Sequence, residues 1–365
     1  MRLDRRHLVR SCLTLPLLMG RSAKAEDNES LRVRASRHAR IYGVAVTTEQ
    51  LLSDVEYRKV IVREAGILVA EGETKRNVLQ PQRNLFNFSG TDAILKFAQR
   101  NAQLMRGHTL VWHRANPKWL TEEIITTRDE KLLTSYINAV VGRYRGQFNS
   151  WDVVNEAIEP EDGLSSGLRE QSIWFQAFGE TYIETAFHCA RAADPKAQLF
   201  YNEANLEGDV AWSERRRRAT IKLLERLISK GVPIDALGIQ GHLKAYRVKY
   251  SDDVFSRFLD DVASLGLRIL ITEFDVADAG GPEDYVQRDA DVASLTRRFL
   301  DVAFSKPSVI GCLSWGISDK YSWLSRDDRY KWPDGQPSRG LPFDQEFKQK
   351  PMWDAMVSAY DKTAL

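Results

Sequence analysis

Eight short apolar stretches, separated by longer amphipathic ones, recur through most of this chain of 365 residues. The apolar stretches have the length and the β-branched content of buried strands, whereas the segments between them repeat apolar residues at helical spacing. Such alternation predicts a parallel sheet in an α/β fold, and eight units match a closed (β/α)8 TIM barrel. The predicted strands span residues 41–46, 67–72, 103–112, 150–157, 198–204, 234–243, 268–274 and 309–316.

An open, doubly wound sheet is the structural alternative to this barrel. Nucleotide-binding sheets of that kind carry a glycine-rich phosphate loop after a strand, and no such loop follows any strand predicted here. The sequence also has no low-complexity linker and no internal repeat of 20 to 50 residues. We therefore expect residues 26–365 to form one barrel domain.

The first 25 residues differ from the rest of the chain. A basic stretch is followed by a short apolar stretch, and the segment ends at Ala25 in the small-x-small pattern that signal peptidase cleaves. The apolar stretch is too short to span a bilayer. Residues 1–25 are thus predicted to be a removed export signal, which makes the mature protein periplasmic or secreted. Arg5 and Arg6 resemble a twin-arginine signal, and Sec export is the alternative.

Charge and cysteine content exclude several partners. The chain has 52 basic and 50 acidic side chains, a net charge of +2 that gives no general attraction to nucleic acid or a membrane. The basic cluster at 214–220 is interpreted as the start of a solvated helix. The three cysteines show no metal-binding spacing, so we expect no metal and no cofactor. We also expect a monomer.

Polar and aromatic side chains occur where most of the predicted strands end. In a TIM barrel, the functional side chains lie at this carboxyl-terminal face. One polar residue at one strand end carries little information, but a series of them indicates a lined pocket. The residues are Lys75, His108, Trp112, His113, Asn202, Glu203, Asn205, Gln240, His242, Glu273, Asp275 and Trp315.

Two glutamates stand out, Glu156 after the fourth predicted strand and Glu273 after the seventh. These strands lie roughly across the barrel from each other, so both carboxylates can face one cleft. Glycoside hydrolysis needs such a pair, because one carboxyl group protonates the leaving oxygen while the other attacks or stabilises the anomeric carbon. Trp112, Trp315 and Trp323 could supply aromatic faces for the sugar rings.

Several motifs together make this chain resemble glycoside hydrolase family 10, the retaining endo-β-1,4-xylanases. They are RGHTLVWH, WDVVNEA, YNEAN, IDALGIQGHL, ITEFDV and LSWGISDKYSW, and the likeness runs in order from about residue 40 to about residue 360. The resemblance implies a TIM-barrel glycoside hydrolase that cleaves xylan by double displacement. It also implies a polysaccharide substrate.

The resemblance assigns a role to each matching position. It makes Glu156 the general acid/base and Glu273 the nucleophile, with His242 bonded to Glu273 and Asp275 behind the imidazole. Period-two geometry independently places Glu273 with Asp275 on one strand face, and Gln240 with His242 on another. The implied substrate-binding residues are Glu71, Lys75, Trp112, Trp315 and Trp323 at the non-reducing-end subsites, Asn155 and His108 at the hydroxyl beside the cleaved bond, Gln240 near the acid/base, and Asn205 on the leaving-group side.

The chain departs from the family pattern at two positions. Gly72 replaces a sugar-binding Asn, and Ala115 stands where the family usually has a Gln. Both changes fall at the second non-reducing-end subsite, so the alternative is the same fold and mechanism acting on a decorated xylan or another β-1,4-glycan. His113, five positions after His108, is expected to face the opposite way and to be structural.

Two competing interpretations belong to other functional classes. A metal-dependent barrel hydrolase would need a paired His-x-His after the first strand, which this sequence lacks. A glycan-binding barrel without activity is the non-enzymatic alternative, and the intact Glu156 and Glu273 argue against it.

Overall fold

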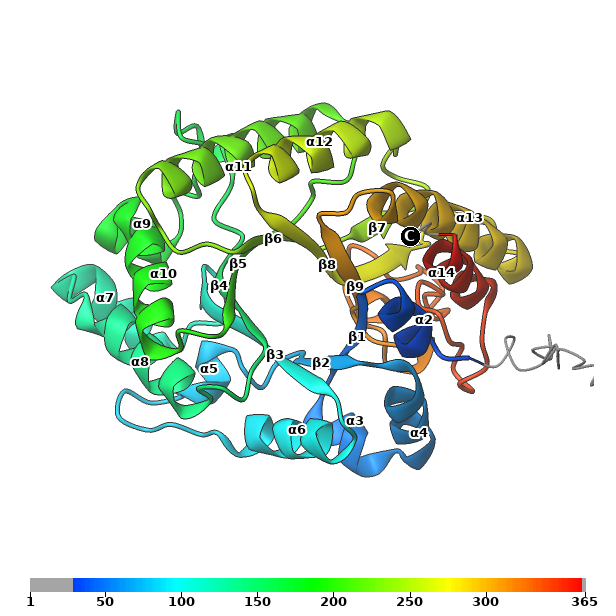
Figure 1. Ribbon diagram of the computed structural model, residues 1–365, viewed down its shortest axis with the longest axis horizontal. Helices are drawn as coiled ribbons and strands as arrows, with labels where there is room; N and C mark the ends of the chain where they lie inside the picture. Colours follow the sequence, from blue (N-terminus) through cyan, green and yellow to red (C-terminus); the bar gives the residue numbers. More distant parts are fainter. Residues whose placement is uncertain (1–28, 363–365) are drawn as a thin grey trace, which may run out of the picture.

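The computed structural model describes residues 29–362, and its strands form one closed parallel barrel with helices around the outside (Figure 1). The predicted export signal, residues 1–25, lies outside the described residues. The strands are β1 (Ile41–Val46), β2 (Ile67–Ala70), β3 (Leu104–Trp112), β4 (Ser150–Asn155), β5 (Gln198–Glu203), β6 (Ala236–Ile239), β7 (His242–Lys244), β8 (Arg268–Ala277) and β9 (Val309–Ser314).

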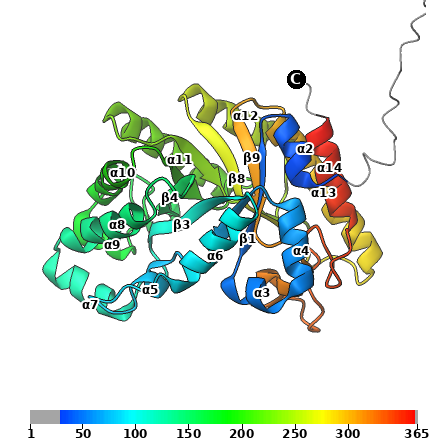
Figure 2. The same ribbon diagram turned by 60° about the horizontal axis from the view of Figure 1, so that its bottom comes forward.

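The helices follow the strands in sequence and cover the outer wall of the barrel (Figure 2). The α-helices are α2 (Leu31–Arg37), α3 (Thr48–Ser53), α4 (Val55–Glu64), α5 (Arg76–Leu79), α6 (Ser89–Arg100), α7 (Lys118–Thr127), α8 (Lys131–Arg143), α9 (Ile173–Phe178), α10 (Thr181–Ala193), α11 (Ala211–Ser229), α12 (Asp252–Ser264), α13 (Tyr285–Phe304) and α14 (Pro351–Asp361). The 3-10 turns are η1 (Pro160–Asp162), η2 (Asp319–Tyr321) and η3 (Trp323–Ser325).

Hydrogen bonding between neighbouring strands closes the barrel. The sheet runs β6-β5-β4-β3-β2-β1-β9-β8, and a parallel β6–β8 pairing joins its two ends, with Ala236 opposite Arg268. Every pairing is parallel, as expected for strands that are connected through helices. The predicted TIM barrel is confirmed, and the open doubly wound sheet is excluded.

The sixth predicted strand, 234–243, is not continuous. It divides into β6 and β7 because Gly241 adopts φ +78°, a left-handed conformation that ends the extended run. A side chain at this position would also approach Ile271 Cγ2 to 2.8 Å. The break lets β7 pair with β8 separately and sets His242 opposite Asp275. The prediction of one continuous strand over residues 234–243 is therefore wrong.

The core lies in two layers, one inside the barrel and a larger one between strands and helices. Trp151 of β4 is completely buried in the outer layer, and its ring stacks on Phe148 at 4.7 Å between centroids. It packs directly on the backbone of β3, where a side chain at Gly107 would lie 2.0 Å from Trp151 Cε3. Trp151 thus packs in the core, and Gly107 is the residue that makes room for it.

The Gly107→Ala variant should lower the free energy of unfolding by about 1–3 kcal/mol, because a close-packed interior resists an added methyl group. Urea denaturation followed by tryptophan fluorescence measures this loss. The matched control is Gly142→Ala in α8, where a side chain would meet nothing within 4 Å. The control should leave stability unchanged or slightly raised, since Ala favours a helix. Equal stability of both variants would contradict the packing argument.

Candidate active site

The carboxyl-terminal ends of the barrel strands surround a cleft of about 460 Å³. Both Glu156 and Glu273 line it. Asp275 lies behind His242, and the remaining predicted site residues all reach the cleft surface. They are Glu71, Lys75, His108, Trp112, Asn155, Asn205, Gln240, His242, Trp315 and Trp323.

Glu273 of β8 is buried, with 5% of its surface exposed. Asn202 Nδ2 donates to its Oε1 at 2.7 Å, and His242 Nε2 lies 3.3 Å from its Oε2. Burial alone would raise the pKa of this carboxyl group, but His108, His242 and Lys75 together outweigh burial and lower the pKa of Glu273 to about 2. Glu273 is therefore ionised throughout the neutral range.

His242 lies between two carboxylates. Its Nδ1 is 2.8 Å from Asp275 Oδ1, and the second oxygen of Asp275 accepts a hydrogen bond from Trp323 Nε1 at 2.7 Å. Burial would lower the pKa of the imidazole, yet Asp275 and Glu273 raise it to about 10. The ring is thus a cation that donates from both nitrogens, which fixes it in place beside Glu273.

Glu156 follows β4 with φ +54°, a conformation that non-glycine residues adopt rarely and that turns its side chain into the cleft. Trp112 Nε1 donates to its Oε2 at 2.9 Å, and Gln240 Nε2 donates to its Oε1 at 2.9 Å. Its side chain is 17% exposed, against 6% for Glu273. Water and a leaving group can therefore reach Glu156 more readily than Glu273.

His113 also lies in the site, contrary to the prediction that it faces away. Its Nδ1 is 3.8 Å from Glu156 Oε2. Burial, reinforced by the charge of Arg169, lowers the pKa of His113 to about 4, so the ring is neutral above that pH. The prediction failed because the pairing of β3 with β4 shifts register between His108 and Val111. Such an irregularity interrupts strict alternation, so counting by twos no longer tells which face a residue occupies.

A chain of amide side chains connects the two glutamates. Gln240 Nε2 bonds to Glu156 and lies 3.5 Å from Asn155 Oδ1. Asn155 Oδ1 in turn accepts from Asn202 Nδ2 at 2.9 Å, and the same nitrogen donates to Glu273. Asn202 was predicted only as a polar strand end and was given no role. The only sequence signal for it was its position in the YNEAN motif.

A buried ion pair lies beneath the cleft, inside the barrel. The guanidinium of Arg106 pairs with the carboxylate of Asp152 and donates to Ser150 Oγ at 2.9 Å. The second oxygen of Asp152 lies 3.0 Å from His108 Nδ1. Asp152 thus orients His108 against Glu273, whose Oε1 is 3.8 Å from the same imidazole nitrogen. This network was not predicted, since nothing in the sequence indicates that a charged pair would fill the barrel.

Rings and a cation form one wall of the cleft. Lys75 Nζ lies 5.1 Å from the centroid of the Trp112 ring and 5.9 Å from that of Trp315. The Trp315 ring meets His108 edge to face at 5.2 Å. Aromatic faces beside hydrogen-bond donors suit a sugar, which has apolar faces and a polar rim.

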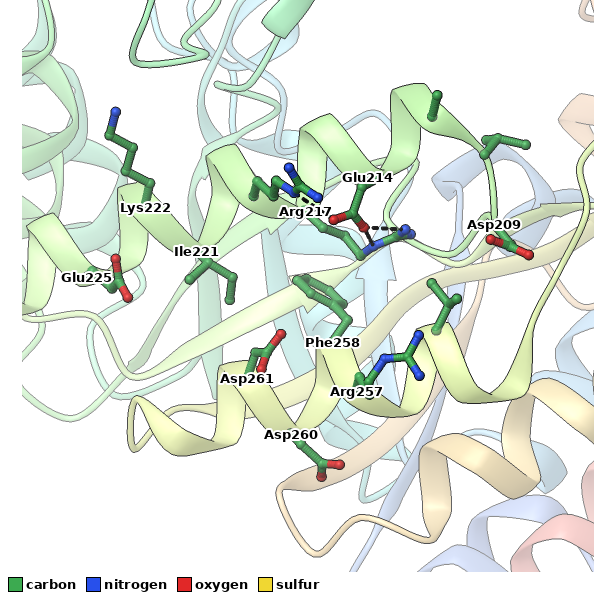
Figure 3. Close-up of a pocket in the computed structure, with 14 residues that line it drawn as sticks. Asp209, Glu214, Arg217, Ile221, Lys222, Glu225, Arg257, Phe258, Asp260 and Asp261 are labelled. Atoms are coloured by element: carbon green, nitrogen blue, oxygen red, sulfur yellow. Dashed lines mark hydrogen bonds and ion pairs between the residues drawn. The ribbon is translucent and has the colours of Figure 1, made fainter.

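A larger hollow, of about 800 Å³, lies elsewhere, on the outer wall between α11 and α12 (Figure 3). Its charged residues partly pair with one another, as Glu214 does with Arg217 and Arg218. Neither cleft glutamate lines it. Size alone therefore does not identify the site, and the converging carboxylates place it in the smaller cleft.

Residues 29–362 contain no group of three or more His, Cys, Asp or Glu side chains arranged to hold a metal ion. Within the same residues, every helix is too short or too polar to cross a membrane.

Comparison with known proteins gives a consistent result. A family model described as glycosyl hydrolase family 10 matches residues 30–359. Endo-1,4-beta-xylanase B of Thermotoga neapolitana is 34% identical over 313 residues, covering 84% of this chain and 84% of that protein. Beta-1,4-xylanase of Dictyoglomus thermophilum is 35% identical over 319 residues, covering 83% and 84%.

Solved structures agree with this match. Native xylanase 10B from Thermotoga maritima has a TM-score of 0.80 and 33% identity, over 91% of this chain and 98% of that one. Xylanase 10B from Thermotoga petrophila RKU-1 in complex with xylobiose also has a TM-score of 0.80 and 33% identity, over 92% and 98%.

The His242→Asn variant should raise the pKa of Glu273 from about 2 by roughly one to three units, because it removes a neighbouring cation. Carboxyl-labelled glutamate followed by NMR between pH 3 and 7 measures this directly. The wild-type Glu273 resonance should stay constant over that range, whereas the variant should titrate within it. His188→Asn, an exposed position of α10, is the matched control. A Glu273 resonance that stays constant in the His242 variant would contradict the electrostatic argument.

Proposed function

The chain belongs to glycosyl hydrolase family 10, and from that premise we propose that it is a retaining endo-β-1,4-xylanase with Glu156 as acid/base and Glu273 as nucleophile. One observation carries this proposal. Two glutamates from separate strands face one cleft and are joined by the amides of Gln240, Asn155 and Asn202. Double displacement needs two such carboxyl groups at a fixed spacing.

The first step breaks the bond between the anomeric carbon and the leaving oxygen. Glu273, held as a carboxylate, attacks the anomeric carbon, while Glu156 gives its proton to the departing oxygen. Glu156 is then a carboxylate and takes a proton from water, whose oxygen attacks the same carbon and releases Glu273. The greater exposure of Glu156 supports this assignment, since it must serve both a leaving group and water.

The names of the relatives support xylan as the substrate. Those relatives are called xylanases, and xylanase 10B of Thermotoga petrophila binds xylobiose. In this chain, Lys75 and the rings of Trp112 and Trp315 form a wall of the cleft that suits a sugar. We also retain the alternative of a decorated xylan or another β-1,4-glycan.

That alternative is based on Gly72 and Ala115, where sugar-binding amides are absent. A side chain built at Gly72 would meet no atom within 4 Å, so the space beside the second non-reducing-end subsite is open. An open subsite binds plain xylose with fewer hydrogen bonds and leaves room for a substituent.

We further propose that the protein acts as a monomer in the periplasm or outside the cell. The leader-like pattern of residues 1–25 supports export, and a polymeric substrate is too large to be taken up intact. Both glutamates and the side chains that hold them come from one chain, so the proposed site requires no second copy.

The variants Glu273→Gln and Glu156→Gln should lose activity on different sets of substrates. Glu273→Gln should abolish hydrolysis of every substrate, because it removes the carboxylate that attacks the anomeric carbon. Glu156→Gln should lose activity on xylan but still form the glycosyl-enzyme from aryl glycosides whose leaving groups need no proton. Stopped-flow measurement of the aryl group released in the first turnover separates the two.

Equal loss on xylan and on activated aryl glycosides in the Glu156 variant would contradict its role as the acid. The first product anomer seen by proton NMR is a second readout. A retaining enzyme releases the β-anomer first, and initial release of the α-anomer would overturn the mechanism.

The Gly72→Asn variant should lower KM for linear xylotetraose several-fold, because the amide returns a hydrogen bond to the second non-reducing-end subsite. Steady-state kinetics with xylotetraose and with xylobiosyl aryl substrates measures the change. The open space at this position means that the new side chain should not disturb the fold. Unchanged KM in a folded variant would show that the missing amide does not limit binding.

A further inference from the structure

Glu203, the last residue of β5, is a buried carboxylate that the proposed reaction does not use. Like Asn202 before it, it was predicted only as a polar strand end. Its side chain is 0% exposed, so a substrate cannot touch it. It is bonded instead to the residues that follow Glu156, and we call residues 156–159 the acid/base loop. Any role of Glu203 in positioning Glu156 rests on the proposed function.

Both oxygens of the Glu203 carboxylate accept hydrogen bonds. Its Oε2 accepts from the backbone N–H of Ile158 at 3.1 Å and from the hydroxyl group of Tyr201. Its Oε1 accepts from the backbone N–H of Ala204 at 2.9 Å, and Arg216 Nη1 lies 3.6 Å from the same oxygen. The bond to Ile158 joins the end of β5 to the acid/base loop, which lies 45 residues earlier in the chain.

These four partners all present donors to Glu203. A carboxylate can accept at both of its oxygens, whereas the amide of a glutamine would turn its NH2 group toward a donor. Burial raises the pKa of Glu203 to about 7, although the charge of Arg216 and the hydrogen bond from Tyr201 oppose the rise. Arg216 therefore helps an ionised carboxylate to remain at this buried position.

Arg216 of α11 also holds the acid/base loop directly. Its Nη1 donates to the carbonyl oxygen of Ile158 at 2.7 Å, and its Nη2 pairs with Glu159. Glu203 thus accepts from the N–H of Ile158 while Arg216 donates to the C=O of the same residue. We call Glu203 and Arg216 the clamp, because two opposite charges on separate elements hold one residue between them.

The acid/base loop needs such support because Glu156 has φ +54°. A non-glycine residue persists in this conformation only where its surroundings hold it. The N–H of Glu156 donates to Asn202 O at 2.9 Å, and Arg169 Nε donates to its carbonyl oxygen at 3.1 Å. The carbonyl oxygen of Glu203 accepts from Gln240 N at 3.0 Å, and the Gln240 side chain bonds to the Glu156 carboxyl group. Glu203 therefore contacts both the loop and the residue whose amide orients Glu156.

We propose that Glu203 is a positioning residue for the acid/base. Its carboxylate and the guanidinium group of Arg216 fix the backbone of Ile158, and thereby keep Glu156 in the turn that points its side chain into the cleft. Loss of the clamp displaces the carboxyl group that gives its proton to the leaving oxygen. Glu273 is held by side chains outside the clamp, so its attack on the anomeric carbon is spared.

The Glu203→Gln variant should separate substrates by their need for a proton. On xylan, kcat/KM should fall roughly ten- to a hundred-fold, because a displaced acid slows proton transfer. First-turnover release from dinitrophenyl xylobioside, whose leaving group needs no proton, should stay within about two-fold of the wild-type rate. Steady-state kinetics and stopped-flow absorbance measure the two. Equal loss on both substrates would overturn the proposal.

The matched control is Glu64→Gln, which changes another completely buried carboxylate. Glu64 belongs to α4 and accepts from the N–H of Leu31 at 2.9 Å, far along the chain from the acid/base loop. Both glutamine variants should lower the melting temperature, but Glu64→Gln should affect xylan and dinitrophenyl xylobioside equally. A merely structural role of Glu203 would give the pattern of this control.

A double-mutant cycle shows whether Glu203 acts through Glu156. With phenyl xylobioside, whose leaving group does need a proton, Glu203→Gln should slow the first turnover when Glu156 is intact but not in a Glu156→Gln background. Additive losses would contradict the clamp. If Glu203→Gln does not fold, Glu203→Asp takes its place in every measurement. It keeps the negative charge but is one methylene group shorter, so it should lose the bond to Ile158 and show the same pattern.

Failure of this inference can be told apart from failure of the proposed function. If Glu156→Gln spares dinitrophenyl xylobioside and Glu203→Gln does not, the clamp is wrong and the acid/base assignment stands. If Glu156→Gln itself loses activity equally on xylan and on the dinitrophenyl substrate, the proposed function fails, and the role of Glu203 fails with it.

Discussion

The two cleft glutamates depend on one chain of amide side chains, which runs from Gln240 through Asn155 to Asn202. This chain exists only because β4, β5 and β6 lie in parallel register, with Asn155 opposite Asn202 and Asn202 opposite Gly238. A side chain at Gly238 would approach Asn202 Oδ1 to 2.2 Å, so a glycine is needed beside the central amide. Closure of the barrel thereby fixes the position of the two glutamates relative to each other.

The closed barrel buries the charged carboxylate of Glu273 and also supplies the groups that stabilise it. Glu273 is ionised although buried, which would be unfavourable without partners. His242 supplies a cation on one side, and Asp275 holds that cation in place with the help of Trp323. On the other side of Glu273, His108 is hydrogen-bonded to Asp152. Arg106 forms an ion pair with Asp152 inside the barrel and balances its charge. Each charge near Glu273 is thus supported by a further buried group.

Much of this arrangement could be predicted from the sequence, because it depends on local patterns. Strand periodicity indicated the barrel, and the carboxyl ends of its strands indicated where Glu156 and Glu273 would meet. The errors come from irregular geometry. A register shift in β3 brings His113 into the site, and the left-handed Gly241 divides the sixth predicted strand. The bridging role of Asn202 depends on contacts between distant segments, which strand periodicity does not reveal.

The two ends of the cleft differ in a way that bears on the reaction cycle. Under the proposed function, Gly72 and Ala115 stand where sugar-binding amides would lie on the non-reducing-end side, whereas Lys244, which bonds to Asn205, places a cation on the leaving-group side. Binding energy on the leaving-group side is present while the glycosidic bond breaks and is lost once that product departs. Such contacts can stabilise the first transition state without holding the sugar that remains on Glu273. On the proposed mechanism, weak contacts on the non-reducing-end side then let the second product leave quickly, so this distribution of contacts favours turnover over tight product binding.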